Sequence, residues 1–400
     1  MADWSQLPQD LLDKIATELT FCIDLLRFRS ICSSWRSSIS YPPHCFPNRI
    51  PICPPNPTTG LIDSGYFYLS KRIIAKLISP DQNQINKPWI IKLEQDVSDK
   101  SHLLNPLSES KIQPLPSNFP KLFDFMDIGI SELGQEYVLR YANKQAFGFA
   151  GDVYREKVIF SSNPPGSKEV DYVIMTIHVS GKLAMFKLKD NTWSIIDDMP
   201  SPYDDLILYK GEFYAVDSTG RAVVVVGPSL GVEEVTSSVF GGDKKYLVEL
   251  DGDLLLVDRY LSIGSDDHPI YLNNVHDYEI FVPANDDTYV IDTTVQFKIY
   301  KLDWREKSWV EVKTLGDHML FLGDNCSFST TASDISGTKG NCIYFTDRYF
   351  QINKEEDGAF RCHCIGVFNL EDASIGPLAA YPGYSQLFWP PPTWITSQTS

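Results

Sequence analysis

Apolar residues recur at helical spacing in the first forty positions of the chain. One run extends from 11 to 19 and a second from 25 to 39. Pro8 suits a first helical turn, and Asp24 can cap the second run. The spacing of three and four residues between apolar positions predicts two or three short helices that share a small core.

From residue 61 the pattern changes to short apolar runs separated by turn residues. Three segments consist of an apolar strand, a glycine-containing turn and a second apolar strand: 205–217, 246–258 and 319–328. Two others pair a strand with a Trp-led strand across a polar turn, at 183–196 and 297–312. These patterns are typical of antiparallel hairpins.

Alternating the two kinds of hairpin gives four-stranded antiparallel sheets at the pitch of propeller blades. We therefore predict a mainly β protein with a small N-terminal helical module and a C-terminal antiparallel β-propeller-like domain; a large β-sandwich is the alternative. Strands near 66–71, 89–94, 102–107 and 111–115 are candidates for a first blade. Segment 120–150 fits this pattern poorly and is left unassigned.

This pattern divides the chain into a helical module at 1–40, a linker at 41–60 and a β-domain at 61–400. Seven prolines lie between positions 42 and 57 of the linker. Such a segment forms a stiff, non-helical spacer, although proline-rich sequence also serves as a ligand for aromatic-lined domains. A spacer would hold the helices away from the sheets, so their surplus apolar side chains favour an external partner over the β-domain.

The charge of the chain narrows the choice of partners. Lys plus Arg is 35 and Asp plus Glu is 52, which gives a net charge of −17. Such a field repels phosphate and disfavours nucleic acid and anionic membranes as partners. No apolar stretch reaches the ~18 residues that a spanning helix needs. The first residues also do not form a secretory signal, so we expect a nuclear or cytoplasmic protein.

No catalytic or cofactor-binding motif is present in the sequence. It contains no phosphate-binding glycine loop, no nucleophile elbow and no His-Glu-x-x-His. Acidic pairs such as Asp204-Asp205 fit solvated loop carboxylates better than acid–base catalysis. The run Cys362-His363-Cys364 has no second cysteine pair that would complete a zinc site. We therefore expect no catalytic residue, no metal site and no cofactor.

Two sequence blocks in the helical segment are characteristic of a known family. The first, residues 7–15, reads Leu-Pro-Gln-Asp-Leu-Leu-Asp-Lys-Ile, and the second, residues 24–36, ends in Arg-Ser-Ile-Cys-Ser-Ser-Trp-Arg. Both blocks, at this separation, resemble the F-box motif; Ile31 stands where valine is usual. F-box proteins link a Skp-type adaptor, and through it a cullin-based SCF ubiquitin ligase, to a target protein.

The resemblance implies which residues contact the adaptor. The positions that match the motif are Leu7, Pro8, Leu11, Leu12, Ile15, Leu25, Leu26, Ile31, Cys32 and Trp35. Some of them, Trp35 and Ile15 especially, are also candidates for the module's own core. The two roles are compatible.

The remainder of the chain resembles the C-terminal domain of a large plant F-box family, often labelled kelch-like. The similar motifs are 104–108, Leu115-Pro116, 209–211 and 368–372. The double-glycine kelch repeat is absent. The resemblance implies a non-catalytic substrate-receptor subunit of an SCF-type ligase that captures an unidentified protein target for degradation.

Two other functions remain open from the sequence. One is a propeller-type glycan- or metal-binding protein or enzyme, and the other is an F-box protein that delivers no target for degradation. Residues 1–40 carry five acidic and four basic residues, so −16 of the net charge lies in the remaining 360 residues. This distribution predicts a target with a basic surface.

Overall fold

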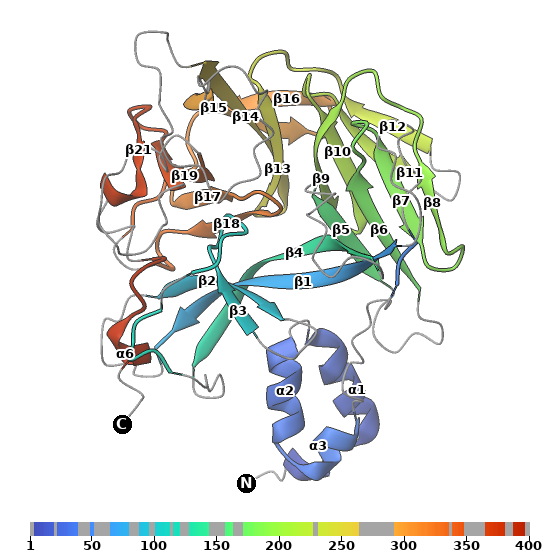
Figure 1. Cartoon of the computed structure of the whole chain (residues 1–400), viewed down its shortest axis with the longest axis vertical. Helices are drawn as coiled ribbons and strands as arrows, with labels where there is room; N and C mark the ends of the chain where they lie inside the picture. The colour runs from blue at the N-terminus through green and yellow to red at the C-terminus, as the bar shows by residue number, and fades with distance from the viewer. Residues whose placement is uncertain are drawn as a thin grey trace.

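The helices at the N-terminus and the strands that follow form separate cores (Figure 1). The computed structural model describes residues 4–19, 22–38, 49–51, 65–79, 88–95, 101–112, 115–120, 128–143, 157–162, 171–226, 231–263, 292–335, 338–347, 365–380 and 387–396. The helical module consists of η1 (Trp4–Gln6), α1 (Gln9–Glu18), α2 (Cys22–Ser30) and α3 (Ser33–Ser38). Its core is formed by Leu12, Phe28 and Trp35. Among the side chains that the structure describes in this module, these three connect α1, α2 and α3.

The β-domain starts with two sets of strands that share one sheet. The first set is β1 (Gly65–Ile78), β2 (Trp89–Gln95), β3 (Ser101–Leu104) and β4 (Gly129–Asn143). The second is β5 (Val158–Ser162), β6 (Tyr172–Ile177), β7 (Leu183–Lys187) and β8 (Thr192–Ile195). The strand order is β3-β2-β1-β4-β5-β6-β7-β8, and among the described residues Tyr137 and Val158 form the one pair that joins the two sets. We call the sets unit 1 and unit 2.

Three further sheets complete the described strands. Unit 3 contains β9 (Tyr203–Tyr209), β10 (Glu212–Asp217), β11 (Ala222–Val226) and β12 (Gly231–Thr236). Unit 4 contains β13 (Lys244–Leu250), β14 (Asp253–Ile263), β15 (Asp292–Asp303) and β16 (Ser308–Val312). Unit 5 contains β17 (His318–Leu322), β18 (Ser327–Thr331), β19 (Cys342–Thr346), β20 (Ile365–Asn369) and β21 (Ile375–Pro377), in the order β18-β17-β19-β20-β21. The pair β17–β19 is parallel, and the other recorded strand pairs are antiparallel.

The packing between units closes them into a ring (Figure 1). Five apolar clusters each combine side chains of two units: 1 with 2, 2 with 3, 3 with 4, 4 with 5, and 5 with 1. Strand contacts around the centre follow the same circle, from β4 to β5, β9, β13, β18 and back to β4. Closure buries both faces of each sheet, which a single sheet could not do. The predicted propeller-like domain is confirmed.

The glycine-turn hairpins are present where the sequence predicts them. Residues 205–217 cover most of β9 and all of β10, residues 246–258 cover parts of β13 and β14, and residues 319–328 cover most of β17 and the first two residues of β18. The first turn has φ of 50° at Lys210 and 84° at Gly211. Positive φ at both turn positions is the type I′ geometry that matches the twist of the strands.

The first unit differs from the prediction. Residues 66–71, 89–94 and part of 102–107 lie in β1, β2 and β3, whereas the described residues of 111–115 add only an isolated bridge between Lys111 and Leu104. The place of the predicted fourth strand is taken by β4, from the unassigned segment 120–150, which pairs with β1 along its length. Glu136 and Arg140 obscured the apolar pattern of β4, because the residues that pair with them lie on other strands.

Part of the predicted linker belongs to the β-domain. Ile50 pairs with Phe67 of β1 and is fully buried, and the Trp193 indole donates a hydrogen bond of 2.7 Å to the Pro51 carbonyl. The rest of segment 41–60, apart from 49–51, lies outside the described residues. The helical module also touches the β-domain, since the Arg27 guanidinium donates to the Ile128 carbonyl at 2.5 Å. The helical module therefore contacts the β-domain at this point, while its core stays separate from those of the sheets.

The C-terminal residues cover part of unit 1. After η2 (Leu378–Ala380), the short helix α6 (Thr393–Thr396) places Ile395 in a cluster with side chains of β1 and β2. The Trp89 indole donates a hydrogen bond of 2.8 Å to the Phe388 carbonyl. Within the described part of the chain, no helix is long and apolar enough to cross a membrane.

Candidate functional site

The helical module exposes apolar side chains that its core does not use. Leu11 is 44% exposed and Ile15 is 37% exposed, and their spacing of four residues places them on one face of α1. Ile31, after α2, is 54% exposed, and Pro8 is also exposed. These four residues are available for contact with another protein, and we call the side of α1 that carries Leu11 and Ile15 the exposed face.

Several of the other motif positions belong to the core of the module or pack against it. Leu12 is fully buried, Trp35 is buried, and Leu7 and Cys32 pack against the same core. Ile15 does not join that core, contrary to one of the roles considered for it. Leu25 and Leu26 lie on α2, but the structure does not describe their side chains. Whether these positions contact an adaptor stays a prediction.

The exposed aromatic residue Trp4 was not in the predicted set. Trp4 in η1 is 66% exposed, and its carbonyl accepts a hydrogen bond of 2.9 Å from the Trp35 indole. This bond connects η1 to the module's core. The sequence does show a Trp three residues before the motif, but it does not show whether the Trp ring points into the core or into solvent.

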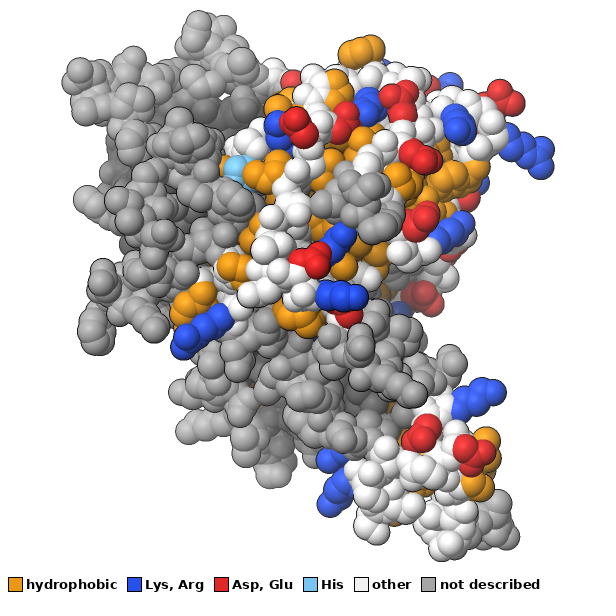
Figure 2. Space-filling view, turned by 90° about the vertical axis from the view of Figure 1, so that its right-hand side faces the viewer, with side chains coloured by type: hydrophobic (Ala, Val, Ile, Leu, Met, Phe, Trp, Pro, Cys, Tyr) orange, Lys and Arg blue, Asp and Glu red, His pale blue; other side chains and the backbone are white. Residues whose placement is uncertain are grey.

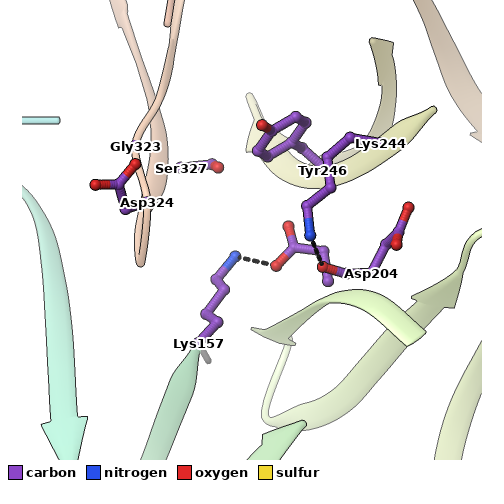
Figure 3. Close-up of a pocket in the computed structure, with 8 residues that line it drawn as sticks. Lys157, Asp204, Lys244, Tyr246, Gly323, Asp324 and Ser327 are labelled. Carbon is purple, nitrogen blue, oxygen red and sulfur yellow. Dashed lines mark hydrogen bonds and ion pairs between the residues drawn. The ribbon is translucent and has the colours of Figure 1, made fainter. Parts of the chain in front are cut away.

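A second candidate site is a cavity near the centre of the propeller. Its volume is about 120 Å³, and its lining comes from four units: Lys157, Asp204, Asp205, Lys244, Tyr246, Gly323, Asp324 and Ser327 (Figure 3). Lys157 directly precedes β5. Asp204 and Asp205 lie near the start of β9, and Lys244 and Tyr246 lie near the start of β13. The ring of units therefore gathers side chains that are distant in sequence.

The sequence suggested that Asp204 and Asp205 are solvated loop carboxylates, and this prediction is wrong. Both residues lie in β9, and Asp205 is 3% exposed. The Asp205 carboxylate forms an ion pair of 2.8 Å with Lys157 and accepts hydrogen bonds from the backbone amides of Leu206 and Leu247. Burial raises the pKa of Asp204, despite nearby Lys244. The sequence did not reveal these long-range partners.

Unit 1 contains a buried network of ion pairs. Glu136 of β4 is bound at 2.8 Å by both Arg72 of β1 and Lys92 of β2. Arg72 and Arg140 also contact the Glu94 carboxylate. Burial tends to raise the pKa of Glu94, but the two guanidinium groups outweigh it and hold that pKa below its usual value. This network gives Glu136 and Arg140 of β4 a structural role.

Acidic and basic side chains alternate over the face of the β-domain that Figure 2 shows. Among the residues that the structure describes, no group of three or more His, Cys, Asp or Glu residues could hold a metal ion. The run 362–364 lies outside those residues. The described geometry therefore presents two candidate sites, the exposed face of the helical module and the central cavity.

Comparison with protein families gives a match for each domain. Residues 4–46 match the F-box domain, and residues 69–369 match the KIB1-4 beta-propeller. The second match covers most of the chain and the greater part of all five units. Solved structures add little: a Synechocystis apocarotenoid oxygenase mutant covers 79% of this chain, and the chain covers 81% of it, at 10% identity and a TM-score of 0.27.

Two relatives from Arabidopsis thaliana match over almost the whole length. The F-box protein SKIP23 is 42% identical, and the alignment covers 99% of this chain and 96% of that protein. The F-box protein At2g17036 is 33% identical, with the same shares covered. The chain belongs to the family of plant F-box proteins in which an N-terminal F-box precedes a KIB1-4 β-propeller.

Proposed function

We propose that this protein is a non-catalytic substrate receptor of an SCF-type ubiquitin ligase. The helical module binds a Skp-type adaptor, which connects it to a cullin, and the propeller binds a target protein. Holding the target near the ubiquitin-loaded enzyme raises the effective concentration of its lysines. The observation that carries the proposal is the exposed apolar face on a module that matches the F-box domain.

The division of the motif into buried and exposed positions supports adaptor binding. Leu12 and Trp35 are buried within the module, so they maintain the shape of α1 and α3. Leu11 and Ile15 have no such structural use, and burying them against a partner would remove apolar surface from water. Apolar side chains that are exposed together in this way are typical of surfaces that bind another protein.

A binding assay with a purified Skp-type adaptor tests this role. The double change Leu11→Asp with Ile15→Asp places two charges on the exposed face and should weaken binding at least about tenfold. Val310→Asp is the matched control, because Val310 is 51% exposed but lies on β16 of the propeller. Wild-type protein that does not bind the adaptor, or a double variant that binds equally well, would refute the proposal.

The propeller carries the larger part of the negative charge, and we propose that its target presents a basic surface. Target capture should then weaken more than adaptor binding when salt is raised, because apolar contacts are less sensitive to screening.

Proximity labelling with the proteasome inhibited, followed by reconstituted ubiquitination, would identify targets and test for degradation. We expect the protein to act in the nucleus or the cytoplasm, which imaging of a fluorescent fusion would test.

A further inference from the structure

The central cavity is large enough for a small ligand. Its volume of about 120 Å³ compares with the roughly 10–15 Å³ that one water needs on the same scale. Lys157, Lys244 and Ser327 reach it from units 2, 4 and 5 (Figure 3). The cavity therefore lies where a ligand would touch three separate units.

Unused hydrogen-bond donors face this space. Lys157 forms its recorded ion pair with Asp205, and Lys244 donates 3.0 Å to the backbone carbonyl of Asp204. An ammonium group has three N–H donors, so each lysine retains further capacity. The Ser327 hydroxyl points toward the centre in Figure 3, and no side-chain hydrogen bond of Ser327 is recorded among the described residues.

The acceptors of the lining are already used or directed elsewhere. The Asp205 carboxylate accepts two backbone amides and the Lys157 ammonium. In Figure 3 the side chains of Asp204 and Asp324 extend away from the two lysine ammonium groups. Asp324 accepts a hydrogen bond of 3.0 Å from the Thr346 hydroxyl.

The directions of the lining side chains indicate which kind of ligand the cavity would bind. The two lysines and three aspartates give the lining a formal charge of −1, so net charge alone does not select an anion. The directed groups with spare capacity are donors, however, and a ligand that replaces water there must supply acceptors. A carboxylate or phosphate accepts several charge-assisted hydrogen bonds at short range.

We propose that the central cavity binds a small oxyanion, a carboxylate or a phosphate group, through Lys157, Lys244 and Ser327. The bound group connects units 2, 4 and 5 and stabilises the closed ring, because a ligand that binds only the folded state shifts unfolding by mass action. This site is separate from the exposed face of the F-box and adds a small-molecule ligand to the propeller.

Inorganic phosphate and succinate are suitable probes for the full-length protein. Isothermal titration calorimetry and thermal unfolding should show saturable binding of at least one probe and a higher Tm, with ionic strength matched by NaCl. Lys244→Gln should weaken that binding about tenfold, whereas Lys244→Arg retains the charge and should restore most of it. Lys301→Gln is the control, since Lys301 is an exposed lysine paired with Asp253 outside the cavity. The stronger probe distinguishes a phosphate site from a carboxylate site.

Two results would overturn the inference. One is the absence of saturable binding of either probe up to about 50 mM, far weaker than a specific site. The other is equal binding by Lys244→Gln and wild type. If Lys244→Gln does not fold, Ser327→Ala replaces it and must weaken binding severalfold for the inference to stand. Adaptor binding, measured on the same samples, reports on the proposed function independently.

Discussion

The buried ion pair between Lys245 and Asp258 offers a sharp test of the fold's electrostatics. The two residues face each other on β13 and β14, at 2.7 Å, and both side chains are 0% exposed. The Lys245 ammonium also donates to the carbonyls of Gly241 and Gly242, at 3.3 and 3.0 Å. The lysine therefore has three acceptors, while the carboxylate depends mainly on the lysine.

This asymmetry predicts unequal costs for the two single substitutions. Lys245→Met leaves a buried carboxylate without its counter-ion and should lower the free energy of unfolding by about 3–5 kcal/mol. Asp258→Asn leaves the ammonium with two carbonyls and should cost only about 1–3 kcal/mol. The double variant Lys245→Met with Asp258→Asn removes both charges and should cost clearly less than the sum of the two single changes.

The pH dependence gives an independent check. Burial raises the pKa of Asp258 even with Lys245 present. An acid whose folded pKa is raised contributes stability that is complete below its unfolded pKa, near ~3.9, and lost as pH rises through the folded pKa. Without Lys245 this effect grows, so the deficit of Lys245→Met should be largest at neutral pH and shrink on acidification.

Urea unfolding followed by tryptophan fluorescence measures these differences. Lys301→Met is the matched control, because its pair with Asp253 is 49% and 40% exposed; it should change stability by less than about 1 kcal/mol. If Asp258→Asn destabilises as much as Lys245→Met, or if the double variant equals the sum of the single costs, the reasoning fails.

Three further outcomes follow from other parts of the molecule. Leu12→Ala empties the core of the helical module and should destabilise that module by about 2–5 kcal/mol, visible as earlier loss of helical circular dichroism on heating; an unchanged transition would contradict it. Arg27→Ala removes the bond to the Ile128 carbonyl and should broaden the range of F-box–propeller arrangements in small-angle X-ray scattering; an unchanged scattering profile would show that other contacts fix the module. The pKa of Glu94 is lowered, so its contribution to the free energy of unfolding is complete above pH ~4.3 and is lost as pH falls through the folded pKa. Glu94→Gln should therefore reduce the loss of stability on acidification, and an unchanged loss would disprove this.

Local signals in the sequence predicted the hairpins well. A two-residue turn such as Lys210-Gly211 fixes the register of its own strands, so residues close in sequence contain the whole signal. The same holds for Asp251-Gly252, with φ of 51° and 80°. These turns identified strands of units 3 and 4, and their repetition indicated a propeller rather than a sandwich.

Distant partners explain where sequence reasoning failed. Glu136 resembles a surface residue in the sequence of β4, but Arg72 lies 64 positions earlier and neutralises it in the interior. Asp205 similarly depends on Lys157 and on the Leu247 amide. A charged residue gives no local sign that a partner 40 or more positions away will bury it. Strand β4 and the cavity lining were therefore missed for one physical reason.

The F-box shows a different limit of sequence analysis. Leu11 and Leu12 are adjacent and chemically identical, yet one is 44% exposed and the other is fully buried. Helix geometry turns neighbouring side chains by about 100°, so only the packing of α1 decides which leucine supports the core. Loss of adaptor binding after a change at Leu12 would therefore reflect loss of the module's shape. Loss after a change at Leu11, with helical content unchanged, would instead identify a direct contact, and this comparison distinguishes an interface residue from a core residue within one motif.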